Sequence, residues 1–327
     1  MSTLGHWLDQ NRQRHRLARW QRDGVLRSAD AAATALGIDP TPPWAWFLDR
    51  LGLWGGVSLI GTGVISFIAA NWDALGVMAR LGGIQLLLVG TVGAAWYFRG
   101  KARVFEAGLF LAMMIVGAFL GLIGQTYRIE ADAWHLFAAW TALSLPWVVA
   151  SRSAVLWLAA IALANLTFAL WLRDNSLRYI PANDLVNLSV FNTALFIAWV
   201  AAALRLPELR GRQGPLILAF TALAFVSAAA VRDVAGDRGA AVGSVGFWLV
   251  LMIGFGIYFA RNRPRNLLGL SGLALSALVV ANVVLGRILL ELLRDAIWVL
   301  LMLAVAIVGQ LVGVVVILRR LARSEAS

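Results

Sequence analysis

The chain has 327 residues, of which 61% are hydrophobic and only 14% are charged. A soluble domain contains about 45–50% apolar residues, and so few charges cannot cover a soluble surface of this size, which excludes a soluble globular protein. The net charge of +11 does not indicate nucleic-acid binding, because most arginines lie in short segments between apolar runs, where membrane orientation accounts for them.

The content of cysteine and histidine restricts the chemistry further. The chain has no cysteine and three histidines, His6, His15 and His135. Disulfides, thiolate chemistry and Cys-type zinc sites are therefore excluded. So few histidines also argue against a histidine-rich metal centre, and we expect neither a metal nor a cofactor.

Residues 1–49 differ in composition from the rest of the chain, because they contain no long apolar run. We expect no cleavable signal peptide here. The segment is predicted to form a cytoplasmic helical hairpin, with one helix over 4–22 and a shorter one that Ser28 caps, followed by a stiff proline-rich linker at 40–43. This hairpin offers a surface for a membrane-protein partner, and residues 50–327 are predicted to form the transmembrane bundle.

About ten apolar runs of roughly transmembrane length follow. In lipid, an apolar segment must satisfy its own backbone hydrogen bonds, and the runs lack the period-two alternation of a barrel strand, so each is predicted to be a helix. The fold class is therefore an all-α polytopic membrane protein. The predicted spans are 51–70, 81–98, 104–124, 136–150, 154–172, 188–206, 215–231, 241–260, 267–285 and 296–318.

The basic residues sort to alternate sides of these spans. With ten spans, 20 of the 28 Lys and Arg residues fall on the side of the N-terminus and eight on the other side. Cytoplasmic segments carry the excess of positive charge. We therefore predict a multi-pass protein of the bacterial inner membrane with both termini in the cytoplasm.

Two segments decide details of this topology. Residues 136–172 could form one long tilted helix, but Arg152 would then be stranded in lipid at a cost of about 2.5–3.5 kcal/mol, so a hairpin of two spans is preferred. Between the last two spans, residues 287–295 are predicted to form a short amphipathic helix on the outer interface, in which Arg287 and Glu291 pair four residues apart.

The polar residues at the outer ends of the first, third and fourth spans are the predicted site. If these spans pack together, their polar ends meet and offer a pocket for a small solute or a lipid, or groups for acid–base chemistry. The alternative is that these residues only cap helices and meet water. The candidate residues are Asn71, Asp73, Gln125, Tyr127, Arg128, Glu130, Asp132 and His135.

A few polar residues lie within the spans themselves. Glu106, Asn165, Asn192 and Gln310 are candidates for coordinating a solute inside the membrane. The alternative is that the amides hold helices together and that Glu106 is a surface group near Arg103. Pairs of glycines four residues apart, including the pair at 117 and 121, predict close helix contacts.

Two sequence motifs carry a resemblance to a known family. FIAANWD at residues 67–73 and GLIGQTY at 121–127, with Trp134 and the N-terminal residues 17–26, resemble the bacterial family of predicted membrane proteins called domain of unknown function 2157. The resemblance extends over residues 15–172. It implies no activity, cofactor or ligand, but it favours Asn71, Asp73, Gln125 and Tyr127 as parts of a shared site.

The function expected from these features is that of a transporter or solute-binding membrane protein with its polar site on the extracytoplasmic side. Two alternatives stay open, namely a membrane enzyme acting on a lipid or extracytoplasmic substrate, and a membrane scaffold or sensor. The expected partners are the lipid bilayer and a small solute or lipid, and nucleic acid is not among them. The chain lacks a P-loop and the Gly-x-Ser-x-Gly and His-Glu-x-x-His motifs, so ATP-driven transport and these two types of hydrolysis are not expected.

Overall fold

The computed structural model describes residues 13, 16–17, 19–21, 23–26, 32, 36, 44–70, 76–127, 132–175, 184–236, 241–261, 266–293 and 296–326. The chain divides into two compact units, Met1–Ala70 and Asn71–Ser327. Because residues 71, 73 and 128–131 fall between the described ranges, part of the predicted site lies outside them.

The first unit contains one long helix, α3 (Trp44–Ala70), which covers the first predicted span. Upstream of it, Leu17 is buried against Leu26 and Ala32. Gly24 has a φ of +76°, a left-handed conformation that glycine adopts without steric cost and that commonly ends a helix. The turn that follows is closed by the Val25 N–H, which donates to the Trp20 carbonyl at 2.8 Å.

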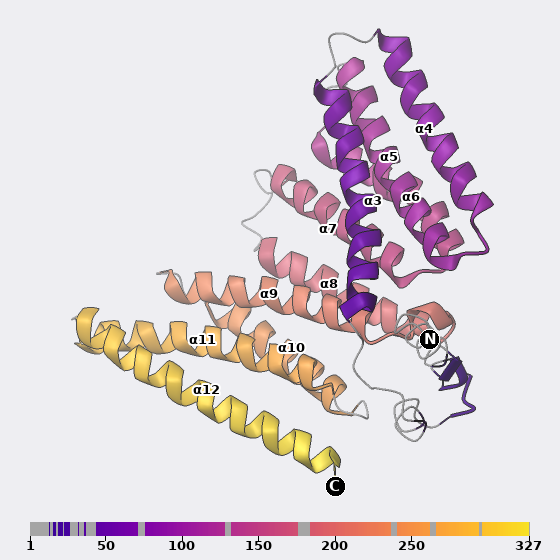
Figure 1. Cartoon of the computed structure of the whole chain (residues 1–327). Helices are drawn as coiled ribbons and strands as arrows, with labels where there is room; N and C mark the ends of the chain where they lie inside the picture. Colours follow the sequence, from indigo (N-terminus) through magenta and orange to yellow (C-terminus); the bar gives the residue numbers. More distant parts are fainter. Residues whose placement is uncertain are drawn as a thin grey trace. The chain divides into compact units, whose positions relative to one another are not determined.

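The second unit contains nine long helices within its described residues (Figure 1). Each matches one predicted span, and each is long and apolar enough to cross a membrane, whereas the apolar stretch recognised in α3 is the shorter Leu51–Val64. No strand occurs in the described ranges. The predicted all-α polytopic fold is therefore confirmed. The helices are α4 (Val77–Tyr97), α5 (Ala102–Thr126), α6 (Ala133–Ser151), α7 (Ala154–Asn175), α8 (Asp184–Ala203), α9 (Gln213–Ala235), α10 (Ala241–Arg261), α11 (Leu267–Leu293) and α12 (Ala296–Ala326).

Residues 136–172 form the predicted hairpin and not a single helix. The helix α6 ends at Ser151, where Arg152 adopts a left-handed conformation with φ 49° and ψ 35°, and α7 begins at Ala154. The two helices pack along each other. A left-handed residue ends a helix because it turns the next amide out of the helical hydrogen-bond pattern.

The segment before α12 differs from the prediction. No separate amphipathic helix follows α11, because α11 continues without a break to Leu293. The predicted pair is present, with Arg287 Nε 3.4 Å from Glu291 Oε1. Arg287 also donates to the carbonyl oxygens of Val234 and Gly236, the latter at 2.6 Å. The Arg287 charge thus lies at the carbonyl end of α9, which favours a cation. Because the charge is accommodated there, α11 can continue past Arg287.

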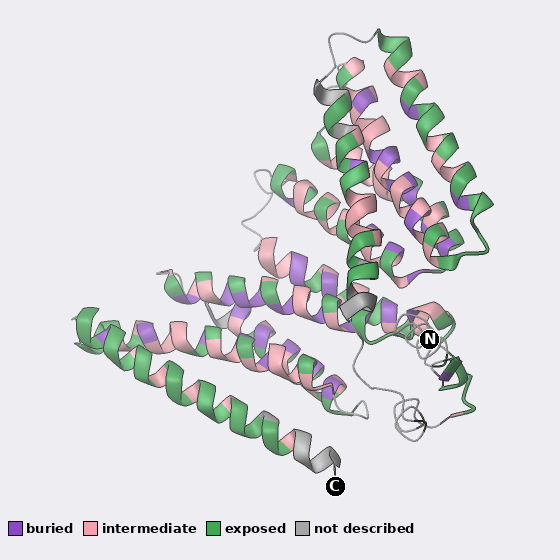
Figure 2. Ribbon diagram, viewed as in Figure 1, coloured by how far each residue is buried: buried purple, intermediate pink, exposed green. Residues whose placement is uncertain are grey.

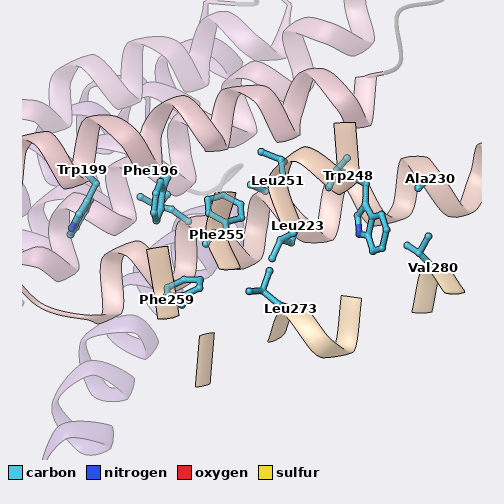
Figure 3. Packing of buried hydrophobic residues seen from close by; sticks show 14 of the residues in the cluster. Phe196, Trp199, Leu223, Ala230, Trp248, Leu251, Phe255, Phe259, Leu273 and Val280 are labelled. Carbon is cyan, nitrogen blue, oxygen red and sulfur yellow. The ribbon is translucent and has the colours of Figure 1, made fainter. Parts of the chain in front are cut away.

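The core of the second unit lies around α9, which packs against α8, α10 and α11. Figure 2 shows buried residues recurring along α9, whereas α12 is exposed along most of its length. Aromatic and aliphatic side chains fill this core, among them Phe196, Trp199, Phe255 and Phe259 (Figure 3). Apolar side chains exposed elsewhere are those expected to face lipid, since lipid tails are as apolar as leucine.

Candidate functional site at the ends of α6 and α7

The α6–α7 hairpin is held at its turn by hydroxyl groups. Ser151 Oγ donates to the Val148 carbonyl at 2.8 Å and accepts from the Ser153 N–H at 3.2 Å. Ser153 Oγ donates in turn to Glu106 Oε2 of α5 at 3.1 Å. Glu106, one of the predicted intramembrane residues, therefore joins α5 to this turn, and the turn fixes how α6 and α7 run alongside each other.

The other end of the hairpin carries a cavity. The start of α6 contributes Asp132, Ala133 and Trp134, and the end of α7 contributes Leu170, Arg173 and Asp174, around a volume of about 300 Å³. We call it the Asp132 cavity. Its volume is at the lower end of the range for small-molecule sites, so it has room for a small solute.

Asp132 is positioned by the start of α6. It precedes the first helical residue and its side chain makes no capping hydrogen bond. The carboxylate thus lies at the positive end of the helix dipole, where negative charge is favourable, without being used to close the helix. The His135 N–H donates to the Asp132 backbone carbonyl at 3.0 Å, which fixes the first turn.

His135 lies next to this carboxylate. Its Nδ1 is 3.9 Å from Asp132 Oδ2, and both side chains are about half exposed. An exposed pair at this distance contributes little to stability, so it does not explain why these groups are together. The His135 ring stacks on Trp134 with centroids 3.6 Å apart, and Trp134 also lines the cavity.

The chemistry of the Asp132 cavity is that of a site with both signs of charge. Asp132 and Asp174 supply carboxylates and Arg173 supplies a guanidinium. The Trp134 indole adds an aromatic face, which attracts cationic groups. An arrangement of this kind can hold a small solute that itself carries opposite charges. It can also hold a polar substrate beside two carboxylates.

The predicted residues are brought together only in part. Asp132 and His135 are adjacent at the start of α6, whereas Gln125 and Tyr127 lie at the end of α5 and do not line the cavity. The remaining four candidates, Asn71, Asp73, Arg128 and Glu130, lie outside the described residues. Their part in a site remains a prediction.

Arg173 and Asp174 were missed by the sequence interpretation. A signal for them exists, because residues equally far from the turn of a helical hairpin lie at the same level. Asp132 and Arg173 are about equally far from Arg152 along the chain. Extending the hairpin prediction to its open end would therefore have added the end of α7 to the site.

The predicted intramembrane amides form hydrogen bonds to amides on neighbouring helices. Asn192 Nδ2 on α8 donates to Asn165 Oδ1 on α7 at 2.6 Å. Asn282 Nδ2 on α11 donates to Gln310 Oε1 on α12 at 2.7 Å. Asn282 was not predicted. Hydrogen bonds of this kind hold transmembrane helices together at about 0.6–2 kcal/mol each.

A metal site finds no support in the part of the chain that the structure describes. There, no group of three or more His, Asp or Glu residues is placed to hold a metal ion. Within the Asp132 cavity the potential ligands are two carboxylates and no histidine.

The helices and their composition define the class as a multi-pass α-helical membrane protein. Residues 18–157 match the model of a family described as "Predicted membrane protein (DUF2157)", which confirms the resemblance over that part of the chain. The matched region ends within α7 and includes Asp132 and His135. No curated protein and no solved structure matches the chain significantly.

Proposed function

We propose that the protein binds a small zwitterionic solute in the Asp132 cavity, on the extracytoplasmic side of a bacterial inner membrane. The observation that carries the proposal is the convergence of Asp132, Trp134, Arg173 and Asp174 on one cavity of about 300 Å³. A carboxylate with an aromatic face suits an ammonium group. A guanidinium suits a carboxylate. A solute with both groups would therefore be held at two points.

Transport is the finer form of this proposal, and it receives less support than binding. A transporter is expected to offer polar groups near the middle of the membrane. The amide nitrogens of Asn192 and Asn282 at this depth are engaged with Asn165 and Gln310, although the Oδ1 atoms of Asn192 and Asn282 are buried without a partner among the described residues. Binding at the outer face is therefore the function we put first, and uptake is a second question for the same ligand.

The test is thermal unfolding of the detergent-purified protein in the presence of amino acids and betaines, each compared with its uncharged analogue. A ligand at about 100 times its Kd stabilises the folded state by about 2.7 kcal/mol. We expect stabilisation by zwitterions and none by the analogues. Uptake into proteoliposomes of a ligand that stabilises the protein then decides between transport and binding alone.

Two variants place the binding site. Arg173→Gln removes the cationic residue of the Asp132 cavity, and Arg232→Gln removes an arginine at the end of α9 that pairs with Asp233 at 3.2 Å and does not line the cavity. Stabilisation is expected to disappear in Arg173→Gln and to persist in Arg232→Gln. Equal responses of the two variants would contradict the proposed site. Gln125→Ala, run alongside, tests whether the end of α5 takes part.

A membrane enzyme acting on an extracytoplasmic or lipid substrate is the second candidate. It is favoured by Asp132 and Asp174 lining one cavity with His135 beside them, since paired carboxylates can act as acid and base. Mass spectrometry of each stabilising ligand after incubation with the protein tests this candidate. Conversion that is lost in Asp174→Asn would favour the enzyme over a binding protein.

A further inference from the structure

A second cavity lies at the other end of the helices, where the connection between α8 and α9 approaches the end of α10. It has a volume of about 530 Å³, and its walls include Arg210, Gly211, Arg212, Tyr258, Phe259 and Asn266. We call it the Arg212 cavity. In the predicted orientation it opens toward the cytoplasm, on the opposite side of the membrane from the Asp132 cavity.

The wall of the Arg212 cavity is held in place by specific contacts. The indole Nε1 of Trp199 on α8 donates to the Leu209 carbonyl at 3.0 Å. A Cβ on Gly214, the second residue of α9, would lie 2.2 Å from this indole ring, so a larger residue here would displace the indole. The connection is therefore packed against α8 at one wall of the cavity.

Arg210 belongs to the same wall. Its Nε donates to the Ala203 carbonyl at 3.1 Å and its Nη2 to the Leu204 carbonyl at 3.5 Å. These carbonyls end α8, where a cation is favourable. Anchored in this way, the guanidinium is already oriented beside the cavity. Less side-chain entropy is then lost when it binds a ligand.

The polar groups of the Arg212 cavity are hydrogen-bond donors. Arg210 and Arg212 carry positive charge, Tyr258 has a hydroxyl, and no carboxylate lines the cavity. Asn266 uses its Oδ1 to accept from the Gly269 N–H at 3.1 Å, which leaves its Nδ2 as the donor. Glu208, the acid of the α8–α9 connection, is not among the lining residues. Such a set suits an anion.

The two helices that start at this cavity also favour an anion. Arg212 and Asn266 immediately precede α9 and α11, respectively. Helix N-termini carry a partial positive charge and favour anions. They add to the charge of the arginines, which is the main attraction for a ligand.

We propose that the Arg212 cavity binds a phosphate group attached to a less polar moiety. Two guanidinium groups and neutral donors match the oxygens of a phosphate. The volume is much larger than a phosphate ion needs, and the lining residues Val200 and Leu204, which are not buried, offer apolar surface for the rest of the ligand. Basic pockets between transmembrane helices on the cytoplasmic side bind lipid headgroups, and soluble phosphate compounds carry the same chemistry. This inference does not depend on the solute proposed for the Asp132 cavity.

The experiment separates the two sources of phosphate on the full-length protein in neutral detergent after removal of lipid. One arm measures retention of phosphatidylglycerol against phosphatidylcholine by native mass spectrometry. The other measures equilibrium binding of pyrophosphate and AMP. We expect saturable binding in at least one arm, and the arm that responds identifies the source. Absence of saturable binding in both arms would overturn the proposal.

The matched variants are Arg212→Gln and Arg205→Gln. Arg205 lies in the same connection and carries the same charge, but it does not line the cavity. Loss of a charge-assisted contact is expected to weaken binding about ten-fold in Arg212→Gln, with little change in Arg205→Gln. Equal affinities of the two variants would refute the site. Tyr258→Phe, which keeps the ring and removes only the hydroxyl, is expected to weaken binding as well. It provides an independent test of the site if Arg212→Gln does not fold.

Discussion

Arg152 is the one non-glycine residue in the described part of the chain with a left-handed conformation, at φ 49°. This conformation costs an L-residue with a Cβ roughly 1–2 kcal/mol, and asparagine tolerates it better than most. We therefore expect thermal stability in detergent to follow the order Arg152→Gly, Arg152→Asn, Arg152→Ala, with about 1 kcal/mol between the first and the last. All three variants lose the same charge, so the order isolates the backbone. Equal stability of the glycine and alanine variants would show that residue 152 is not left-handed.

Single polar residues were easier to identify from the sequence than their partners. Asn165, Asn192 and Gln310 were recognised because amides are rare in apolar spans. Their bonding partners depend on which helices are neighbours and at what height, and a single sequence does not contain that register. Asn282, which donates to Gln310, was missed for this reason, as Arg173 and Asp174 were in the Asp132 cavity.

At the scale of helices, Gly117 determines how closely α5 and α6 approach. A Cβ at this position would lie 2.2 Å from Cε2 and Cζ2 of Trp140. This indole is fixed, since its Nε1 donates to the Met113 carbonyl at 2.7 Å. Gly117→Ala must therefore displace the indole or separate the helices, and we expect a loss of about 1–3 kcal/mol of stability, measured by thermal unfolding in detergent.

Gly121 provides the control for this prediction, because it lies one turn further along α5 and a Cβ added to it would have no atom within 4 Å. Gly121→Ala removes a glycine from a helix interior, which typically raises stability by about 0.5–1 kcal/mol. Opposite signs for the two substitutions are expected. A loss of equal size at both positions would mean that the Trp140 contact does not govern the effect.

The helices themselves were predictable because each is specified by local composition. Length and apolar content predicted the positions of the ten helices from α3 to α12, and the cost of placing Arg152 in lipid predicted the break between α6 and α7. The end of α11 was predicted wrongly, because the predicted span ends at residue 285 whereas the helix continues through Arg287 to Leu293. The carbonyls of Val234 and Gly236 that accept from this guanidinium lie at the end of another helix. Only the tertiary structure reveals this contact.

At the scale of the whole molecule, the two cavities differ in charge and, in the predicted topology, in the side of the membrane on which they lie. The Asp132 cavity contains both signs of charge, whereas the Arg212 cavity contains cationic and neutral donors only. Three helices, α6, α7 and α8, separate Tyr127 from Leu204 in the chain. If each of these helices crosses the membrane, the odd number of crossings puts the two positions on opposite sides, and the same holds for the two cavities.

Because the chain contains no cysteine, single cysteines can be labelled without background to test this topology. Tyr127 and Leu204 are 61% and 78% exposed and lie outside the helices they follow. The excess of arginine on the side of the N-terminus predicts that Tyr127→Cys faces outward and Leu204→Cys inward. A membrane-impermeant maleimide applied to intact cells should therefore label Tyr127→Cys, and it should label Leu204→Cys only after permeabilisation. Labelling of both variants in intact cells would indicate that residues 136–172 cross the membrane only once. Labelling of Leu204→Cys alone would show the opposite orientation, with the Arg212 cavity outside.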